Sequence, residues 1–425
     1  LAGEHYRDSI YKEAYGKETA LKAADVKAFL ANARAHVAHT IAENRRPDAL
    51  YHAYNILHIH PGEKSAAVQN LGVMLEGQVA VLSSKAITPL QAQQSLQALK
   101  ASDLYCPKRN SYILYADKSL PTFLQFNRVE KEAAQAIPLL ASLLENQDLR
   151  LLKSSKDDCF RFNSSIRNRF ELDAELDKLA TEPQLAELVA NDRDAIHNLY
   201  ESTFQHHSFT GRSGSMFAYE GLGCIYWHMV SKLMLAIQEI TLEATNPADL
   251  KTLSNYYYDV QGGLGFRRTA TQYGAFTADA YSHTPAHAGA QQPGLTGMVK
   301  EGLLCRFGEL GIQITGQIIS FKPALVQETE LLKTETTSEI IRSDGSKKAY
   351  TLPEDSLLFT LVQIPVIYVR SSRKTPVTQI YFNNGTSQEI ESDTLPADLS
   401  AGILDRNSTI DYIQVEQPAE RFLSV

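Results

Sequence analysis

The chain has 425 residues, of which 44% are hydrophobic and 21% are charged, and its net charge is −8. This composition is typical of a globular protein and excludes a chain that is disordered throughout. The negative net charge and the scattered basic residues argue against binding to nucleic acid or to an anionic membrane.

The length predicts roughly two or three domains. The cysteines lie far apart without a C-x-x-C pair, which argues against a zinc ribbon or thioredoxin-type centre and favours buried free thiols. No apolar run reaches the ~18 residues of a membrane span. The sequence has no signal peptide and starts at Leu1 rather than Met, so we expect a processed, trimmed or excised polypeptide, whose missing start removes the best evidence about compartment. The expected location is the cytoplasm. We also expect this segment to come from a longer chain, whose N-terminal part, missing from this sequence, would be a partner of it.

Most of the first three quarters of the chain predicts helices. In residues 23–46, apolar residues recur at the 3.6-residue spacing of an amphipathic helix. Residues 65–84 are apolar on more than one face and predict an interior helix. The next helix has a clear start signal, with Thr88 as N-cap, Pro89 in the first turn and Gln91 at the third position.

Further helices are predicted up to residue 310. Residues 181–204 predict one or two helices. Residues 223–244 form the longest predicted helix, in which Trp227 has the spacing of a core residue. Asn246 is the predicted cap of the next helix, with a proline directly behind it. Residues 294–310 predict the last helix.

After Gly311 the pattern changes to β-branched, alternating runs, which predict strands. Asp344-Gly345 and Asn383-Asn384-Gly385 are hairpin signals. Pro365 inside one run indicates an edge strand or a bulge. We therefore expect a mostly α protein, with a helical domain over residues 1–311 and a small antiparallel β-sandwich domain over residues 312–425 that docks on the helices.

Three glycine-bearing segments between the helices carry the densest group of polar side chains: residues 204–223, 256–276 and 281–297. Fourteen of the 23 glycines fall between Gly211 and Gly311. Because a glycine costs about 1 kcal/mol in a helix interior, this concentration predicts shaped loops. The third segment, YSHTPAHAGAQQPGLTG, has no charged residue but many neutral hydrogen-bonding side chains.

This mixture of side chains suits a sugar, because amides, histidines and carboxylates bind hydroxyls while aromatic rings cover the C–H faces. Cleavage of a glycosidic bond then needs a carboxylic acid, and a second group that activates water or a phosphate that attacks. The candidate carboxylates are Glu220, Asp259 and Asp279. The candidate substrate-binding residues are Arg212, Arg267, Arg268, Tyr281, His283, His287, Gln291 and Gln292.

Other interpretations of these residues stay open. The glycine-rich GRSGSM does not match a phosphate-binding P-loop, and Pro285 between His283 and His287 argues against a zinc site on a helix. The histidines also suit hydrogen-bonded loop packing, and Arg267 and Arg268 also suit salt bridges. Glu220 is either catalytic or stabilises the start of the long helix.

Two earlier stretches also carry more directed polar groups than a plain loop needs. One holds Tyr51, His52, Tyr54 and Asn55, and the other holds Asn163, Arg167 and Asn168. Glu76 lies in an otherwise apolar helix, where a buried carboxylate is costly unless it is paired. It is therefore either a structural ion-pair member or a site residue.

Several strings in the sequence carry a family resemblance: YHAYNIL, MLEGQVAVLSS, FTGRSGSMFAYEGLGCIYWHMVSKL and YSHTPAHAGAQQPGLTGMVKE. They resemble segments of large uncharacterised bacterial proteins associated with the six-hairpin (α/α)6 glycosidases and their cellobiose-phosphorylase-like relatives. The resemblance covers about Tyr51 to Gly311. The catalytic-acid motif of the characterised families is absent, so no catalytic residue is carried over.

The resemblance implies a helical (α/α)6 toroid with an attached β-sandwich domain. It also implies a carbohydrate-active enzyme that cleaves an oligosaccharide by inverting hydrolysis or phosphorolysis. No cofactor is expected, apart from inorganic phosphate as co-substrate of a phosphorylase. We take Glu220 or Asp259 as the general acid, with the other carboxylate orienting water. The rival hypothesis is a non-catalytic glycan-binding or scaffold module.

Overall fold

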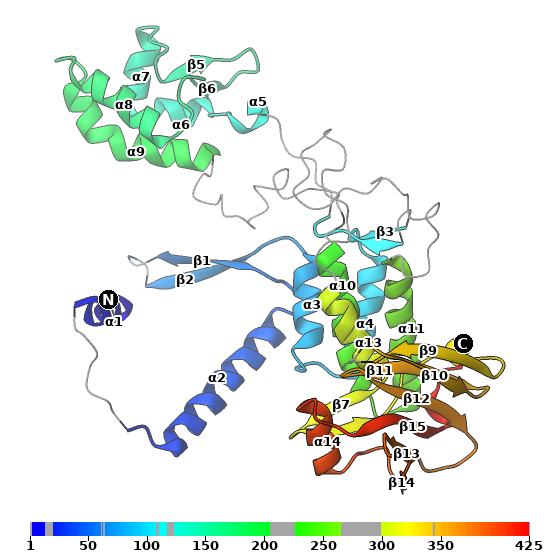
Figure 1. Cartoon of the computed structure of the whole chain (residues 1–425). Helices are drawn as coiled ribbons and strands as arrows, with labels where there is room; N and C mark the ends of the chain where they lie inside the picture. The colour runs from blue at the N-terminus through cyan, green and yellow to red at the C-terminus, as the bar shows by residue number, and fades with distance from the viewer. Residues whose placement is uncertain are drawn as a thin grey trace.

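The computed structural model describes residues 2–12, 20–60, 62, 64–107, 110–116, 123–204, 225, 227–264, 299–342 and 345–424. Their hydrophobic side chains form separate clusters that define three parts (Figure 1). We call these parts the helical core, the insertion unit (residues 123–204) and the β domain (residues 312–424).

The helical core is centred on α10, which contacts the four other helices of this part. Its helices are α3 (Leu75–Ser83), α4 (Pro89–Ala101), α10 (Trp227–Leu242), α11 (Pro247–Gly263) and α13 (Val299–Glu309). Trp227 is 1% exposed, which confirms its prediction as a core residue. The predicted starts of α4 and α11 are also confirmed. Thr88 and Gln91 form both bonds of a capping box, and the Asn246 side chain accepts the Ala248 N–H.

Contacts between the helices fix their directions. Ser83 at the end of α3 donates to Glu239 near the end of α10 at 2.6 Å, so these helices run the same way. Short connections then reverse the chain into α4 and into α11. His228 of α10 contacts Glu301 of α13, and both residues lie in the first turn of their helix. Therefore α3, α10 and α13 begin, and α4 and α11 end, at the same end of the core, which we call the loop end.

A small hairpin also lies at the loop end. Its strands are β3 (Tyr105–Cys106) and β4 (Ser111–Tyr112). The turn between them touches the last residue of α11, because a Cβ on Gly263 would lie 2.1 Å from the Asn110 carbonyl oxygen. A glycine is required where the two backbones approach this closely.

The insertion unit has a hydrophobic core of its own, to which α7, α8 and α9 contribute. Its elements are α5 (Phe123–Phe126), α6 (Lys131–Gln135), α7 (Pro138–Glu145), β5 (Leu152–Ser154), β6 (Phe160–Phe162), α8 (Arg169–Ala180) and α9 (Ala186–Phe204). The segments before and after this unit both belong to the helical core. Residues 1–311, predicted as one domain, thus contain two separate hydrophobic clusters.

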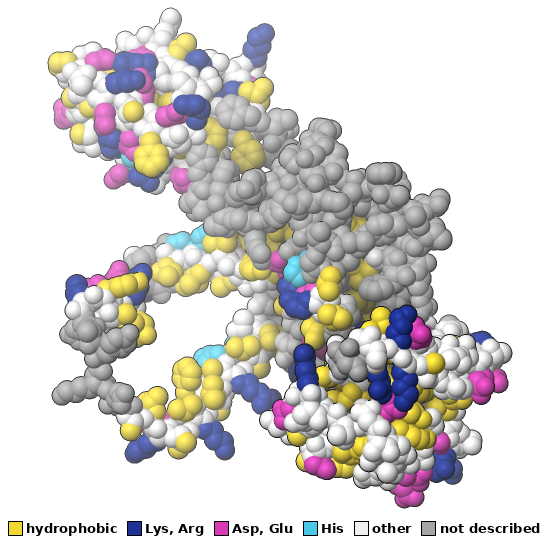
Figure 2. Space-filling view, in the orientation of Figure 1, with side chains coloured by type: hydrophobic (Ala, Val, Ile, Leu, Met, Phe, Trp, Pro, Cys, Tyr) yellow, Lys and Arg dark blue, Asp and Glu magenta, His cyan; other side chains and the backbone are white. Residues whose placement is uncertain are grey.

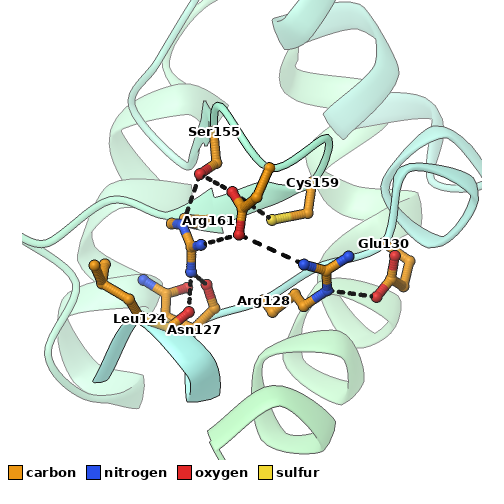
Figure 3. A network of polar contacts seen from close by, with 8 residues as sticks. Leu124, Asn127, Arg128, Glu130, Ser155, Cys159 and Arg161 are labelled. Atoms are coloured by element: carbon orange, nitrogen blue, oxygen red, sulfur yellow. Dashed lines mark hydrogen bonds and ion pairs between the residues drawn. The ribbon is translucent and has the colours of Figure 1, made fainter. Parts of the chain in front are cut away.

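A network of polar contacts in the insertion unit includes Ser155, Arg161, Arg128 and Cys159 (Figure 3). All four side chains donate hydrogen bonds to the carboxylate of Asp157. Arg161 also donates to the Asn127 carbonyl at 2.8 Å, so the β5–β6 hairpin is fastened to the segment after α5. The Cys159 thiol is buried, and burial raises its pKa. It is one of the buried free thiols that the sequence predicted, as is Cys305.

The β domain contains a five-stranded sheet in the order β11-β12-β15-β13-β14. Its strands are β7 (Ile312–Thr315), β8 (Ile318–Phe321), β9 (Thr336–Ile341), β10 (Lys347–Leu352), β11 (Ser356–Leu361), β12 (Ile364–Ser371), β13 (Val377–Phe382), β14 (Ser387–Ile390) and β15 (Ile410–Pro418), with one helix, α14 (Ala397–Leu404). The remaining sheet neighbours are antiparallel, but β12 and β15 run parallel, so the sheet is mixed. The sandwich arrangement, like the toroid, stays a prediction.

Pro365 and the two hairpin signals show how local residues fit this sheet. β12 lies between two strands and pairs with β11 through Pro365 without a register shift, so the prediction of an edge strand or a bulge there was wrong. Pro365 is tolerated because it precedes Val366, where pairing with β15 begins, and its missing N–H is not needed there. The hairpin signals are confirmed: β13 and β14 flank Asn383-Asn384-Gly385, and β9 and β10 flank Asp344-Gly345.

The β domain docks on the end of the helical core opposite the loop end. Gly311 joins α13 to β7 at φ +65°, and a Cβ there would lie 1.9 Å from the Lys322 carbonyl oxygen. Tyr368 of β12 donates to the Leu310 carbonyl at 2.6 Å. Arg306 of α13 pairs with Glu330 at 2.8 Å. These contacts hold the two parts together, as the sequence analysis expected.

Two elements project from the helical core with apolar side chains exposed (Figure 2). Helix α2 (Ala23–Glu43), which follows α1 (Ala2–Lys12), has the predicted apolar stripe but no buried residue, and Phe29 is 69% exposed. The helix predicted over residues 65–84 begins only at Leu75, as α3, so the prediction was wrong for the residues before it. Residues 65–70 form strand β2, which pairs with β1 (Asn55–His60). None of the described helices combines the length and hydrophobicity needed to cross a bilayer.

Candidate functional site

Of the predicted site residues, the described part of the chain includes Asp259. The other two predicted carboxylates and the predicted substrate-binding residues lie outside the described residues. They are Glu220, Asp279, Arg212, Arg267, Arg268, Tyr281, His283, His287, Gln291 and Gln292. For most of this site, the structure therefore describes only the helix ends to which the three predicted loops are attached.

The anchors of the three loops lie at the loop end of the helical core. Helix α10 begins just after the first predicted loop, α11 ends inside the second, and α13 begins just after the third. Ile225, just after the first predicted loop, and Leu264, within the second, are buried in the same hydrophobic cluster. Helix packing thus brings together segments that are far apart in the sequence, since α10 begins at Trp227 and α13 at Val299.

The loop end presents three helix N-termini, those of α3, α10 and α13. Each helix N-terminus carries roughly half a positive charge, because its first N–H groups have no partner within the helix. Met74, the N-cap of α3, forms no side-chain cap, and the Leu75 N–H donates to the Leu114 carbonyl at 3.1 Å. Such termini favour negative charge, and the first turns of α3 and α13 already carry the carboxylates of Glu76 and Glu301.

Asp259 of α11 is paired with Lys100 of α4 at the loop end. The Asp259 side chain is 31% exposed, so the pair contributes little to stability. The two residues line a cavity of about 370 Å³ together with Tyr256. Burial, and to a lesser degree Asp259, raises the pKa of the nearby Tyr112 hydroxyl. The ion pair gives Asp259 a partner within the fold, which fits a structural role as well as a catalytic one.

A second carboxylate, which sequence reasoning missed, is buried at the loop end. Glu301 is 1% exposed, and its Oε1 lies 3.1 Å from Nε2 of His228. Its Oε2 is buried and has no hydrogen-bond partner among the described residues. Burial alone would raise the pKa of Glu301, but its own backbone N–H, His228 and Lys300 together hold it below the ordinary value of 4.5.

We expect the variant Glu301→Gln to lower the free energy of unfolding by about 1 kcal/mol at pH 7. The reason is that a neutral amide oxygen would replace the charged carboxylate that contacts His228. Since the folded-state pKa of Glu301 is lowered, its ionised form stabilises the fold above pH 4.5, and this contribution is lost as the pH falls through the lowered pKa. Urea unfolding at pH 7 and pH 4 measures both effects.

The matched control is Glu187→Gln. Glu187 also lies in the first turn of a helix, α9, but it is exposed. It should change the unfolding free energy by no more than about 0.5 kcal/mol. If the free energies of unfolding of wild type and Glu301→Gln differed by the same amount at pH 7 and pH 4, this result would contradict the role assigned to the Glu301 charge.

Tyr54 and Glu76, which the sequence singled out separately, meet at the start of α3. The Tyr54 hydroxyl donates to the Glu76 carboxylate at 2.7 Å. Both residues line a cavity of about 310 Å³ with Tyr51 and His52. The Nδ1 atom of His52 is buried there without a hydrogen-bond partner among the described residues. Aromatic rings, an imidazole and a carboxylate around one cavity fit a sugar ring with its hydroxyls.

The second stretch, from the insertion unit, has structural roles instead. Asn168 caps α8 by accepting the Glu171 N–H at 2.9 Å. Asn163 donates to the Leu149 carbonyl at 2.9 Å. Arg167, which precedes α8, pairs with Glu171 in the first turn of that helix. These contacts explain the polar residues of the stretch without a ligand.

A sequence signal for Glu301 does exist, because Glu301, Cys305 and Glu309 recur at a spacing of four along α13. All three are buried, so the acidic residues occupy the apolar face of the helix. Lys100 and His228 offer no comparable signal, since each is identified only by the helix packed against it.

Comparison with known proteins adds a match within the insertion unit. Residues 120–207 match the family described as GH149 phosphorylase insertion domain 2. These limits enclose the separate hydrophobic core described above, from Val129 to Phe204. No curated protein matches the chain. The match supports a carbohydrate-active, glycoside-phosphorylase-like family.

Proposed function

We propose that the chain takes part in the phosphorolysis of an oligosaccharide. The observation that carries this proposal is the match of residues 120–207 to a phosphorylase insertion domain. Phosphate is proposed over water as the attacking group because the matched family is described as a phosphorylase. The N-terminus of α10 at the loop end, which has no acidic residue in its first turn, would also favour an anion. Hydrolysis is the other reaction that the sequence left open.

In the proposed reaction, a phosphate oxygen attacks the anomeric carbon while a carboxylic acid protonates the leaving glycosidic oxygen. The new bond joins sugar and phosphate, and the other product is the shortened oligosaccharide. We assign the acid to Glu220, because Asp259 already pairs with Lys100. Arg267, Arg268 and the neutral residues of the third loop would hold phosphate and hydroxyls. The cavity at Tyr54 and Glu76 would bind a sugar ring.

The test is turnover of a panel of oligosaccharides with and without inorganic phosphate. Sugar 1-phosphate that forms only with phosphate supports the proposal, and the reverse reaction should release phosphate from sugar 1-phosphate and an acceptor. Free reducing sugar formed equally well without phosphate would indicate hydrolysis. Glycan binding without either product would favour the rival, a non-catalytic module.

A further inference from the structure

The β domain contains a cavity of its own, far along the chain from the predicted loops. Its volume is about 400 Å³, which falls within the ~300–1,000 Å³ of small-molecule sites. It lies where the turn between β11 and β12 faces the end of α14 and the start of β15. None of the described residues that line it has an assigned role.

Positive charge dominates this cavity. Arg342 and Arg406 line it, and Asp411 is the one acid among the described lining residues. Asp411 is already occupied, because it pairs with both Arg342 and Lys348. Arg406 pairs with no carboxylate among the residues that the structure describes. Burial and repulsion from Arg342 lower the pKa of Lys348, as expected where cations outnumber acids.

Two tight turns shape the backbone around the cavity. Val362 and Gln363 form the two-residue β11–β12 turn with φ values of +48° and +68°, as such a turn requires. Arg406 has φ +59° just after α14, at a position where a glycine is usual. These turns place Gln363 and Arg406 in the lining of the cavity.

Neutral groups complete the lining. The Asn383 amide oxygen accepts a hydrogen bond from Arg342 at 3.2 Å, which leaves the amide NH2 group to donate. The Ser408 oxygen accepts the Ile410 N–H at 3.1 Å, which leaves the hydroxyl proton to donate. Ile364 and Ile403 contribute apolar surface. None of the described lining residues is aromatic, which disfavours a stacked nucleotide base.

We propose that this cavity binds the phosphate monoester of a sugar, with the phosphate at Arg406 and Arg342 and the sugar hydroxyls at Gln363, Asn383 and Ser408. Arginine is suited to this task, because its planar fork of N–H donors matches two phosphate oxygens at once. The ligand is inferred from the cavity alone, so the inference does not depend on the proposed function.

The experiment uses the full chain with 13C-labelled isoleucine methyl groups and glucose 1-phosphate as the probe. Ile364, Ile403 and Ile410 report on the cavity, whereas Ile225 reports on the loop end of the helical core. We expect saturable shifts of the three cavity isoleucines, with a dissociation constant at least 10-fold weaker in Arg406→Gln. Lys374→Gln, which removes an exposed charge of the β domain outside the cavity, should bind as wild type does.

The remaining arms identify the ligand and separate this inference from the proposed function. Inorganic phosphate should bind more weakly than glucose 1-phosphate, and glucose should not bind. Unmoved cavity isoleucines, or equal affinity of Arg406→Gln and wild type, would overturn the proposal. Tighter binding of inorganic phosphate than of the sugar ester would overturn the sugar assignment. Loss of turnover with intact shifts at the cavity would instead count against the phosphorolysis proposal alone.

Discussion

Replacing Glu220 by glutamine is expected to lower phosphorolysis by about 10²–10⁴-fold, because the amide cannot donate a proton to the leaving oxygen. The substrate should still bind, since the amide keeps the size and hydrogen-bonding groups of the acid. The loss should therefore appear in kcat rather than in KM. Initial rates of sugar 1-phosphate formation over a range of oligosaccharide concentrations measure both constants.

Asp259→Asn is the companion variant, since it tests the other predicted carboxylate. Its ion pair with Lys100 is partly exposed, so the variant should lose less than about 1 kcal/mol of stability. It should also retain far more turnover than Glu220→Gln. If Asp259→Asn lost most of its turnover while Glu220→Gln kept normal turnover, Asp259 would be the general acid in place of Glu220. Normal turnover of both variants would remove both residues from catalysis.

Truncation of Leu176 to alanine is expected to destabilise the insertion unit by about 2–5 kcal/mol. Leu176 is 0% exposed in the core of this unit. Because that core is separate from the one around α10, the loss should stay within residues 123–204. Hydrogen exchange should show faster exchange of α8 and α9 and unchanged protection of α10 and α11.

Leu124→Ala is the matched control, because the same side chain is 59% exposed in α5. It should change exchange rates little in either part. If Leu176→Ala weakened protection of α10 as strongly as that of α9, the two clusters would unfold as one unit. The insertion unit would then not be the independent part described here.

Local signals in the sequence predicted several elements correctly. Thr88 and Asn246 predict the starts of α4 and α11, because each is an N-cap whose side chain accepts a hydrogen bond from a backbone N–H within the next three residues. The strand at residues 65–70 was missed because its partner β1 lies on the other side of a turn, and pairing outweighed the helical pattern. The parallel pairing of β12 with β15 joins strands about 45 residues apart, which no local pattern specifies.

The candidate site was predictable only in part. Glycine content and neutral polar residues indicated the three loops. The sequence also indicated Tyr54 and Glu76 as candidate site residues, but no local pattern predicted the hydrogen bond between them. The pairing of Glu301 with His228 joins residues 73 positions apart, so it depends on how α13 lies against α10. The insertion unit was missed for the same reason, since apolar residues on either side of residue 120 look alike until packing sorts them into two clusters.

The positions at which the insertion unit leaves and rejoins the helical core have a practical consequence. Tyr115 bridges to Met74 at the start of α3, and Ile225 directly precedes α10, so both attachment points lie at one pole of the helical scaffold. The unit is therefore a detachable module. Exchange of residues 123–204 alone for a short glycine linker, or for the module of another enzyme, would not require withdrawing any helix from the scaffold and would keep Glu220 in the chain.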